Sequence, residues 1–185
     1  MSGIATKTLL LTSCVLLLSA CAKPADPPEP ADPPGPALLF AGGHGDLSAE
    51  ERRQVFNQLG LDVTPDGNGY TDQICGQPAD ARVEFRDMNS DGRQEVLVIF
   101  GNDCTSGHAE SSAVLLIRDD SGHLQQNLGF PAASADPLPE KNLGYPDLLI
   151  GGPGFCFPVW RWNGKEYIGL RNDPQMPGGC DHIND

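Results

Sequence analysis

Apolar residues in the second half of the chain fall into short runs that are typical of β-strands. The run 96–100, Val-Leu-Val-Ile-Phe, has no polar position, and such a run predicts a central strand buried on both faces. Shorter apolar or alternating segments, separated by turns rich in Gly, Asp and Asn, indicate further strands. We expect strands at 82–86, 95–100, 113–118, 123–130, 147–150, 158–162 and 165–170.

A single helix is predicted before these strands, at residues 47–60. Ser48 and Glu51 have the spacing of a capping box, and Gly60 is a typical residue at a helix end. The segment 62–80, rich in Gly, Pro, Asp and Asn, predicts a loop.

Two parts of the strand region resemble each other. The segments 95–101 and 147–152, which begin 52 positions apart, match each other, and a loop with one cysteine, a strand, a tight turn and another strand follow each copy. We therefore expect a mainly β fold, in which antiparallel meanders form a propeller-like or sandwich arrangement beside the N-terminal helix.

The first residues predict export. Residues 1–20 contain Lys7 and an apolar segment at 9–18 that is too short to cross a bilayer, which is typical of a signal peptide. Leu18-Ser19-Ala20-Cys21 resembles the lipobox of bacterial lipoproteins, which implies lipidation of Cys21, and Ala22 after it implies the outer membrane, facing the periplasm. The proline-rich residues 21–37 predict an extended tether, and 38–185 a single domain.

Charge and cysteines narrow the class of protein further. The formal charge is −13, and −14 after removal of residues 1–20, which argues against a nucleic-acid partner and favours a cationic one.

Beyond the signal peptide and Cys21, four cysteines remain, which in an exported chain predicts two disulfides. Of three possible pairings we expect Cys75 with Cys104 and Cys156 with Cys180, because each closes a short loop within one half of the chain. Zinc is the alternative, although no C-x-x-C is present and the histidines at 44, 108, 123 and 182 are scattered.

The loop before the central strand predicts a Ca²⁺ site. Asp87, Asn89 and Asp91 alternate, Gly92 allows a sharp turn and Glu95 follows, so hard oxygen ligands surround one turn. Arg93 would contribute its backbone carbonyl. Position 12 of an EF-hand would be Val98 and a strand follows, so the pattern resembles instead the calcium loops of FG-GAP and VCBS-type β repeats. The alternative is a polar turn without metal.

Catalytic motifs are not visible in the sequence. It contains no nucleophile elbow, H-E-x-x-H or phosphate loop, so we expect a protein that is not an enzyme. Trp160 and Trp162 alternate and point to the same face, where they either pack the sheet or form a sugar-binding platform.

Several motifs together resemble the Xanthomonadales immunity lipoproteins. These are the calcium loop, Gly101-Asn102-Asp103-Cys104-Thr105-Ser106-Gly107 before the strand at 113–118, and Gly144-Tyr145-Pro146-Asp147 before Trp160-Arg161-Trp162-Asn163-Gly164-Lys165. The family protects cells against peptidoglycan hydrolases injected by a type IV secretion system, and its members are similar in fold to I-type periplasmic lysozyme inhibitors.

The resemblance implies a periplasmic lipoprotein that inhibits a lysozyme-like hydrolase. We expect the loop 102–110 to carry the anchors, with help from either of two tyrosines. The residues expected to bind the partner are Asp103, Ser106, Gly107, His108, Tyr70 and Tyr145. The competing function is a calcium-dependent envelope module that binds glycan or protein.

Overall fold

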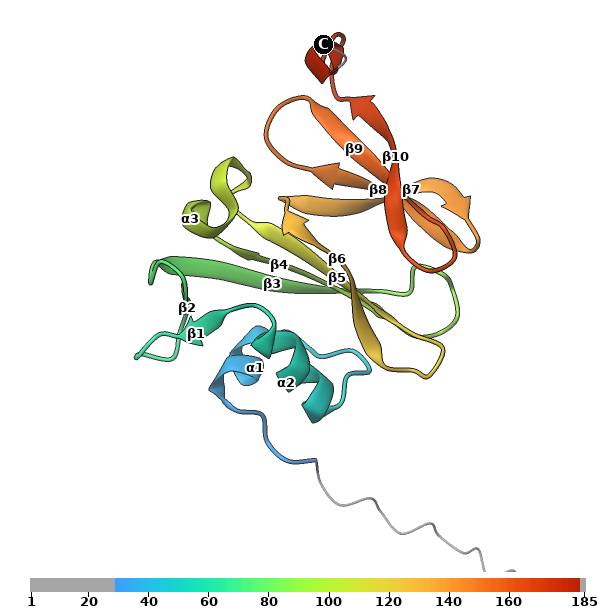
Figure 1. The fold of residues 1–185 in the computed structure, drawn as a ribbon. Coiled ribbons are helices and arrows are strands. Elements are labelled where there is room, and N and C mark those ends of the chain that lie inside the picture. The colour runs from blue at the N-terminus through green and yellow to red at the C-terminus, as the bar shows by residue number, and fades with distance from the viewer. Residues whose placement is uncertain (1–28, 184–185) are drawn as a thin grey trace, which may run out of the picture.

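The computed structural model describes residues 29–183, in which ten strands follow two helices (Figure 1). The helices are α1 (Pro34–Leu39), α2 (Ala49–Asn57) and α3 (Asp103–Ser106), with 3₁₀ turns η1 (Gly107–Ala109) and η2 (Asp181–Ile183). The strands are β1 (Leu61–Val63), β2 (Tyr70–Asp72), β3 (Pro78–Arg86), β4 (Glu95–Gly101), β5 (Ser112–Arg118), β6 (Leu124–Pro131), β7 (Ser134–Asn142), β8 (Tyr145–Gly151), β9 (Cys156–Trp162) and β10 (Tyr167–Pro174). The predicted signal peptide and Cys21 lie outside the described residues. None of the helices between residues 29 and 183 is long and apolar enough to cross a membrane.

The predicted helix is confirmed as α2, together with its capping box. The Ser48 hydroxyl accepts the Glu51 N–H at 3.3 Å, and the Glu51 carboxylate accepts the Ser48 N–H at 2.9 Å. These bonds satisfy amide groups that have no partner inside the helix. The helix ends at Asn57, three residues before Gly60.

The chain joins the domain earlier than residue 38. Residues 34–37 belong to α1, with Pro36 buried, rather than to an extended tether. The buried Arg52 of α2 also pairs with Asp32 and, at 3.5 Å, with Glu29. Proline is well tolerated in the first helical turn, so a proline-rich composition does not distinguish this short helix from polyproline II.

The first sheet has six antiparallel strands in the order β1-β2-β3-β4-β5-β6. The segment 62–80, which was predicted as a loop, contains most of β1, all of β2 and the start of β3, so that prediction is wrong. β1 and β2 have three residues each, and Leu61 and Tyr70 are their buried apolar residues. Strands this short carry no detectable periodicity.

The second sheet has four antiparallel strands in the order β10-β9-β8-β7. We did not predict β7, which contains Pro137 and Pro139; it is an edge strand, where proline is tolerated. The internal repeat is visible in the topology, because β3–β6 and β7–β10 are both four-stranded meanders with β4 and β8 in the second place. The predicted mainly β fold is confirmed, and its two packed antiparallel sheets are sandwich-like.

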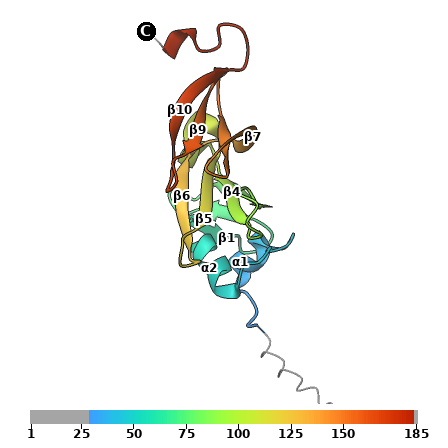
Figure 2. The ribbon, with the colours of Figure 1, turned by 90° about the vertical axis from the view of Figure 1, so that its right-hand side faces the viewer.

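The core has two layers, one on each face of the first sheet. From β4, Val96 and Val98 face the helices, whereas Leu97 and Ile99 face the second sheet. This explains the uninterrupted apolar run. Figures 1 and 2 show the helices at one end of the molecule and the sheet β7–β10 at the other.

Two disulfides, Cys75–Cys104 and Cys156–Cys180, confirm the predicted pairing. Because all four cysteines are oxidised, the zinc alternative for them is wrong. Disulfides of this kind indicate an oxidising compartment outside the cytoplasm.

Candidate functional site

A short helical segment between β4 and β5 projects from one end of the first sheet. Asn102 caps α3: its Oδ1 accepts the Thr105 N–H at 3.1 Å, and its own N–H donates to Thr105 Oγ1 at 3.2 Å. Gly101 precedes this cap with φ 111°, and a Cβ there would lie 2.9 Å from Thr105 Oγ1. The tight exit from β4 therefore requires glycine.

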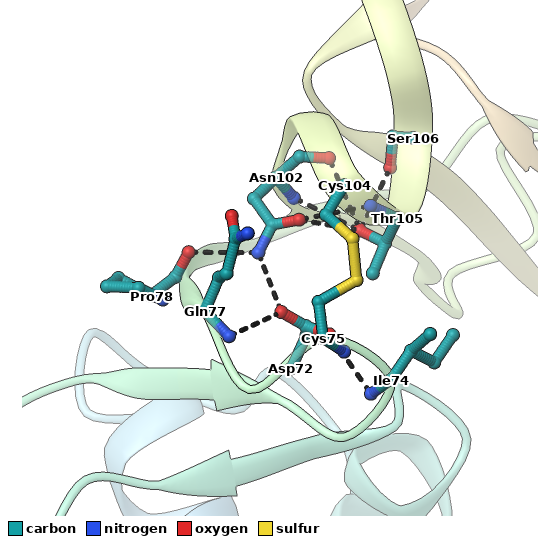
Figure 3. Close-up of a disulfide and its surroundings, with 9 residues drawn as sticks. All are labelled: Asp72, Ile74, Cys75, Gln77, Pro78, Asn102, Cys104, Thr105 and Ser106. Atoms are coloured by element: carbon teal, nitrogen blue, oxygen red, sulfur yellow. Dashed lines mark hydrogen bonds between the residues drawn. A yellow bond between two sulfur atoms is a disulfide. The ribbon is translucent and has the colours of Figure 1, made fainter.

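The disulfide Cys75–Cys104 ties this segment to the loop after β2, and Asp72 supports it from below (Figure 3). The Asp72 carboxylate accepts N–H groups from Ile74, Cys75 and Gln77 and, at 2.9 Å, the side-chain amide of Asn102. The Cys75 N–H and then the Asn102 amide lower the pKa of Asp72 to about 2. Both sides of the disulfide are thus held by one ionised carboxylate.

Around this disulfide lie exposed side chains of two kinds. Ile74 is 84 % exposed, although its backbone is bound to Asp72. Asp103, His108 and Glu110 are exposed on the α3 side. We call this feature the disulfide ridge, which consists of Ile74, the Cys75–Cys104 bond, Asp103, His108 and Glu110.

A hollow lies on each side of the disulfide ridge. One, of about 240 Å³, is lined mainly by apolar groups that include Leu59, Leu61, Ile74 and Phe100. The other, of about 380 Å³, is open and is lined by the carboxylates of Asp80, Asp103 and Glu110. The ridge therefore combines an apolar side with an acidic side.

The residues predicted to bind a partner fall into two groups. Asp103, Gly107 and His108 are exposed on α3 and η1. Ser106 is buried and shares a 2.8 Å hydrogen bond with Ser112, so it supports the segment rather than facing a partner.

The two tyrosines expected to help do not lie at this surface. Tyr70 is 7 % exposed and packs beside Phe56, with ring centroids 6.1 Å apart. Tyr145 is 8 % exposed and belongs to the opposite end of the strands. A role for either ring as an exposed anchor does not fit this structure, because both contribute to the core.

Asp87, Asn89 and Asp91 of the predicted calcium loop direct their oxygens at the loop backbone. The Asp91 N–H donates to Asp87 Oδ1 and Asn89 Oδ1, both at 3.0 Å, and the Gly92 N–H donates to Asp87 Oδ2. Asp91 in turn accepts the Arg93 N–H at 2.8 Å, which lowers the Asp91 pKa. The loop turns sharply, with positive φ at Ser90 and Gly92.

Glu95, the last predicted ligand, is buried and bridges the two sheets. Its carboxylate accepts the Met88 N–H at 2.7 Å and the Tyr145 hydroxyl at 3.2 Å, and Asn89 donates to the same hydroxyl at 2.9 Å. Burial raises the pKa of Glu95 and that of Tyr145. The loop before β4 is thus coupled to the start of β8.

The fit of this loop to a cation is partial. Among residues 29–183, no three His, Cys, Asp or Glu side chains form a metal-ligand group, because Glu95 turns towards the core while the other oxygens face the loop. A carboxylate has about four lone-pair positions, so these hydrogen bonds leave acceptor capacity on Asp87 and Asp91. The oxygen type suits Ca²⁺, and the site stays a prediction.

Comparisons with models of protein families, with curated proteins and with solved structures found no match.

Asp72 and Ile74 are site residues that the sequence did not predict. Asp72 is three residues before Cys75, and a carboxylate close to a disulfide-forming cysteine is only a weak signal for a hydrogen-bonded loop. The spacing of Asn102 and Thr105 resembles a capping pattern and could have indicated α3. Nothing local to Ile74 distinguishes an exposed isoleucine from a buried one.

Proposed function

We propose that this protein is an envelope-anchored inhibitor that binds a cationic cell-wall hydrolase through the disulfide ridge. The observation that carries the proposal is the rigidity of that ridge, where a disulfide, a helix cap and the Asp72 carboxylate hold one exposed segment. A surface that is ordered before binding loses less conformational entropy on association, which favours affinity.

The distribution of charge supports a cationic partner. Each arginine in the described part of the chain pairs with a carboxylate, so the excess negative charge lies on other acids. Three of these acids, Asp80, Asp103 and Glu110, line the hollow beside the ridge. An acidic surface steers a basic enzyme towards it and accelerates association at low salt.

The chemistry of the ridge suits a protein interface. Binding energy concentrates in a few anchors. The exposed Ile74, whose backbone N–H is bound to Asp72, lies beside an apolar hollow and can be buried by a partner. The acidic hollow would receive a lysine or arginine side chain at the rim of the contact. Lipidation at Cys21 in the outer membrane would hold this surface in the periplasm.

The inhibitor proposal is tested by titrating the lipid-free chain 21–185 against basic lysozyme-like hydrolases. We expect inhibition that weakens with added salt. The double variant Asp103→Lys with Glu110→Lys should lose at least about tenfold in affinity, because two favourable charges become repulsive. The matched control, Asp120→Lys with Glu166→Lys, changes the net charge equally at the opposite end of the strands and should lose much less.

Two results would contradict the proposal. One is the absence of inhibition of any such hydrolase at micromolar protein. The other is an equal loss of affinity in both double variants, which would show that net charge acts without the ridge.

We also propose that Ca²⁺ binds in the loop 87–95 and stabilises the turn into β4. A ligand that binds only the folded state at about 100 times its Kd adds roughly 2.7 kcal/mol of stability. The melting temperature should therefore be higher in Ca²⁺ than in EGTA, and the variant Asp87→Asn with Asp91→Asn should lose the difference. Identical melting of the original protein in both conditions would rule out the site.

A further inference from the structure

A third hollow, of about 370 Å³, lies where the two sheets meet at the end of the strands opposite the disulfide ridge. The β5–β6 hairpin forms one wall and the β9–β10 hairpin the other, and both hairpin turns lie at the right of Figure 1. The side chains that matter in it are Asp120, Gln125, Gln126, Trp162, Lys165 and Glu166.

The walls of this hollow are fixed to each other by Asn127. The pairing of β5 with β6 shifts register at this point, which leaves Asn127 in a bulge. Its side-chain Oδ1 accepts the Tyr167 N–H at 3.0 Å, and its Nδ2 donates to the Lys165 carbonyl at 3.2 Å. The hollow is therefore formed before any ligand arrives.

Trp162 supplies an aromatic surface to the hollow and is supported from the core. Its ring centroid is 4.5 Å from that of Tyr145 and 5.5 Å from that of Tyr167. Trp160, by contrast, stacks on Phe130 at 5.1 Å and does not line this hollow. Of the two alternating tryptophans, Trp162 is the one that lines this hollow, whereas Trp160 lines a separate hollow beside Phe130 and Pro153.

The polar groups around Trp162 are of mixed type. Asp120 and Glu166 are acceptors, Lys165 is a donor, and the amides of Gln125 and Gln126 are both; all five side chains are exposed. In the described structure none of the three charged groups forms an ion pair, unlike the arginines. They remain available for hydrogen bonds with a ligand.

We propose that this hollow binds a saccharide, with an apolar pyranose face against the Trp162 indole. Sugar hydroxyl and acetamido groups are donors and acceptors at once, which matches the mixed lining. The two carboxylates would repel a phosphate group, and Lys165 would repel a purely cationic peptide. An apolar ligand would leave the polar groups of the rim without hydrogen-bond partners. A volume of about 370 Å³ is at the small end of ligand pockets and suits one or two sugar rings.

This site goes beyond the proposed inhibitor function and does not depend on it. The chain contains two tryptophans, so ¹⁵N-labelled protein gives two indole N–H signals, which Trp160→Phe assigns. With the N-acetylglucosamine trimer as probe and no hydrolase present, the Trp162 signal should move and the Trp160 signal should stay.

Substitutions localise the effect. Gln126→Ala with Glu166→Ala should weaken saccharide binding by at least about tenfold, because two hydrogen-bonding groups are lost. The control Asp103→Ala, on the disulfide ridge, should bind the trimer like the original protein. Hydrolase inhibition should respond in the opposite way: Asp103→Ala should weaken it, whereas Gln126→Ala with Glu166→Ala should not. Each proposal can therefore be tested even if the other fails.

Two outcomes would overturn the saccharide proposal. The first is an unmoved Trp162 signal at about 10 mM trimer, a concentration that would reveal even millimolar affinity. The second is a Trp162 shift with a lysine-rich peptide and none with the trimer, which would identify the hollow as a socket for a protein side chain.

Discussion

At the scale of single residues, the fold depends on a few polar side chains that it hides. Asp72 is 3 % exposed and Glu95 is 4 % exposed, and each accepts hydrogen bonds that join segments far apart in sequence. A buried polar group is tolerated only when its partners are in place. Substitutions that disturb these two carboxylates should therefore test how firmly each end of the first sheet is held.

Replacing Asp72 by Asn should lower the melting temperature at neutral pH, because a neutral amide cannot accept four hydrogen bonds. Since the pKa of Asp72 is lowered to about 2, its contribution is present above the unfolded value and is lost as pH falls through the folded one. The gap between the variant and the original protein should narrow from about pH 4 to pH 2. Thermal melts across this range measure it, and a gap independent of pH would contradict the role of the ionised carboxylate.

Replacing Tyr145 by Phe should cost about 1–3 kcal/mol of unfolding free energy, because Glu95 loses a donor inside the core. Tyr167→Phe is the matched control, since its buried hydroxyl donates to the neutral Pro146 carbonyl at 2.9 Å. Urea unfolding compares the two. Because hydrogen bonds to charged groups are the stronger ones, a cost no larger than that of Tyr167→Phe would argue against the Glu95 bridge.

At the scale of elements, the two meanders place different loops at opposite ends of the strands. The calcium loop, the β5–β6 turn and the β9–β10 turn lie at one end, and α3 with the disulfide ridge lies at the other (Figure 1). Because strands run antiparallel, every second connection returns to the same end. The end with α3 is the one that a disulfide makes rigid.

Removing Cys75–Cys104 by a double Ser substitution should cost about 2–5 kcal/mol and loosen α3. Removing Cys156–Cys180 should have a similar cost but leave α3 unchanged, because its loop lies in the second sheet. Amide hydrogen exchange at residues 102–110 distinguishes the two variants. Equal protection there in both would show that Asp72 alone holds the ridge.

At the scale of the whole molecule, the two sheets share one apolar layer. Leu97, Leu115 and Leu148 are all at most 1 % exposed, and the first two come from one sheet and the third from the other. Neither sheet can bury this layer alone. The described domain should therefore unfold in one transition.

Leu148→Ala should lower the unfolding free energy by about 2–5 kcal/mol and destabilise both sheets equally. Tryptophan fluorescence reports on β9, and hydrogen exchange of β4 amides reports on the first sheet. Leu143→Ala, at an exposed turn, is the control and should change stability by no more than about 0.5 kcal/mol. Two separate transitions would show that the sheets are independent.

The sequence by itself determined the features that depend on neighbouring residues. The capping box predicted α2, the run 96–100 predicted a strand buried on both faces, and the two repeats predicted paired meanders. The cysteine pairing also followed, because each disulfide closes a short loop, with separations of 29 and 24 residues.

Only the tertiary structure decided which residues are hidden and which are presented. β1, β2 and β7 have weak local patterns and form because neighbouring strands supply hydrogen bonds. Tyr145 was expected at a partner surface and instead bridges the sheets, whereas Ile74 is exposed on a ridge. Burial depends on contacts between distant segments, and no local pattern of residue types records those contacts.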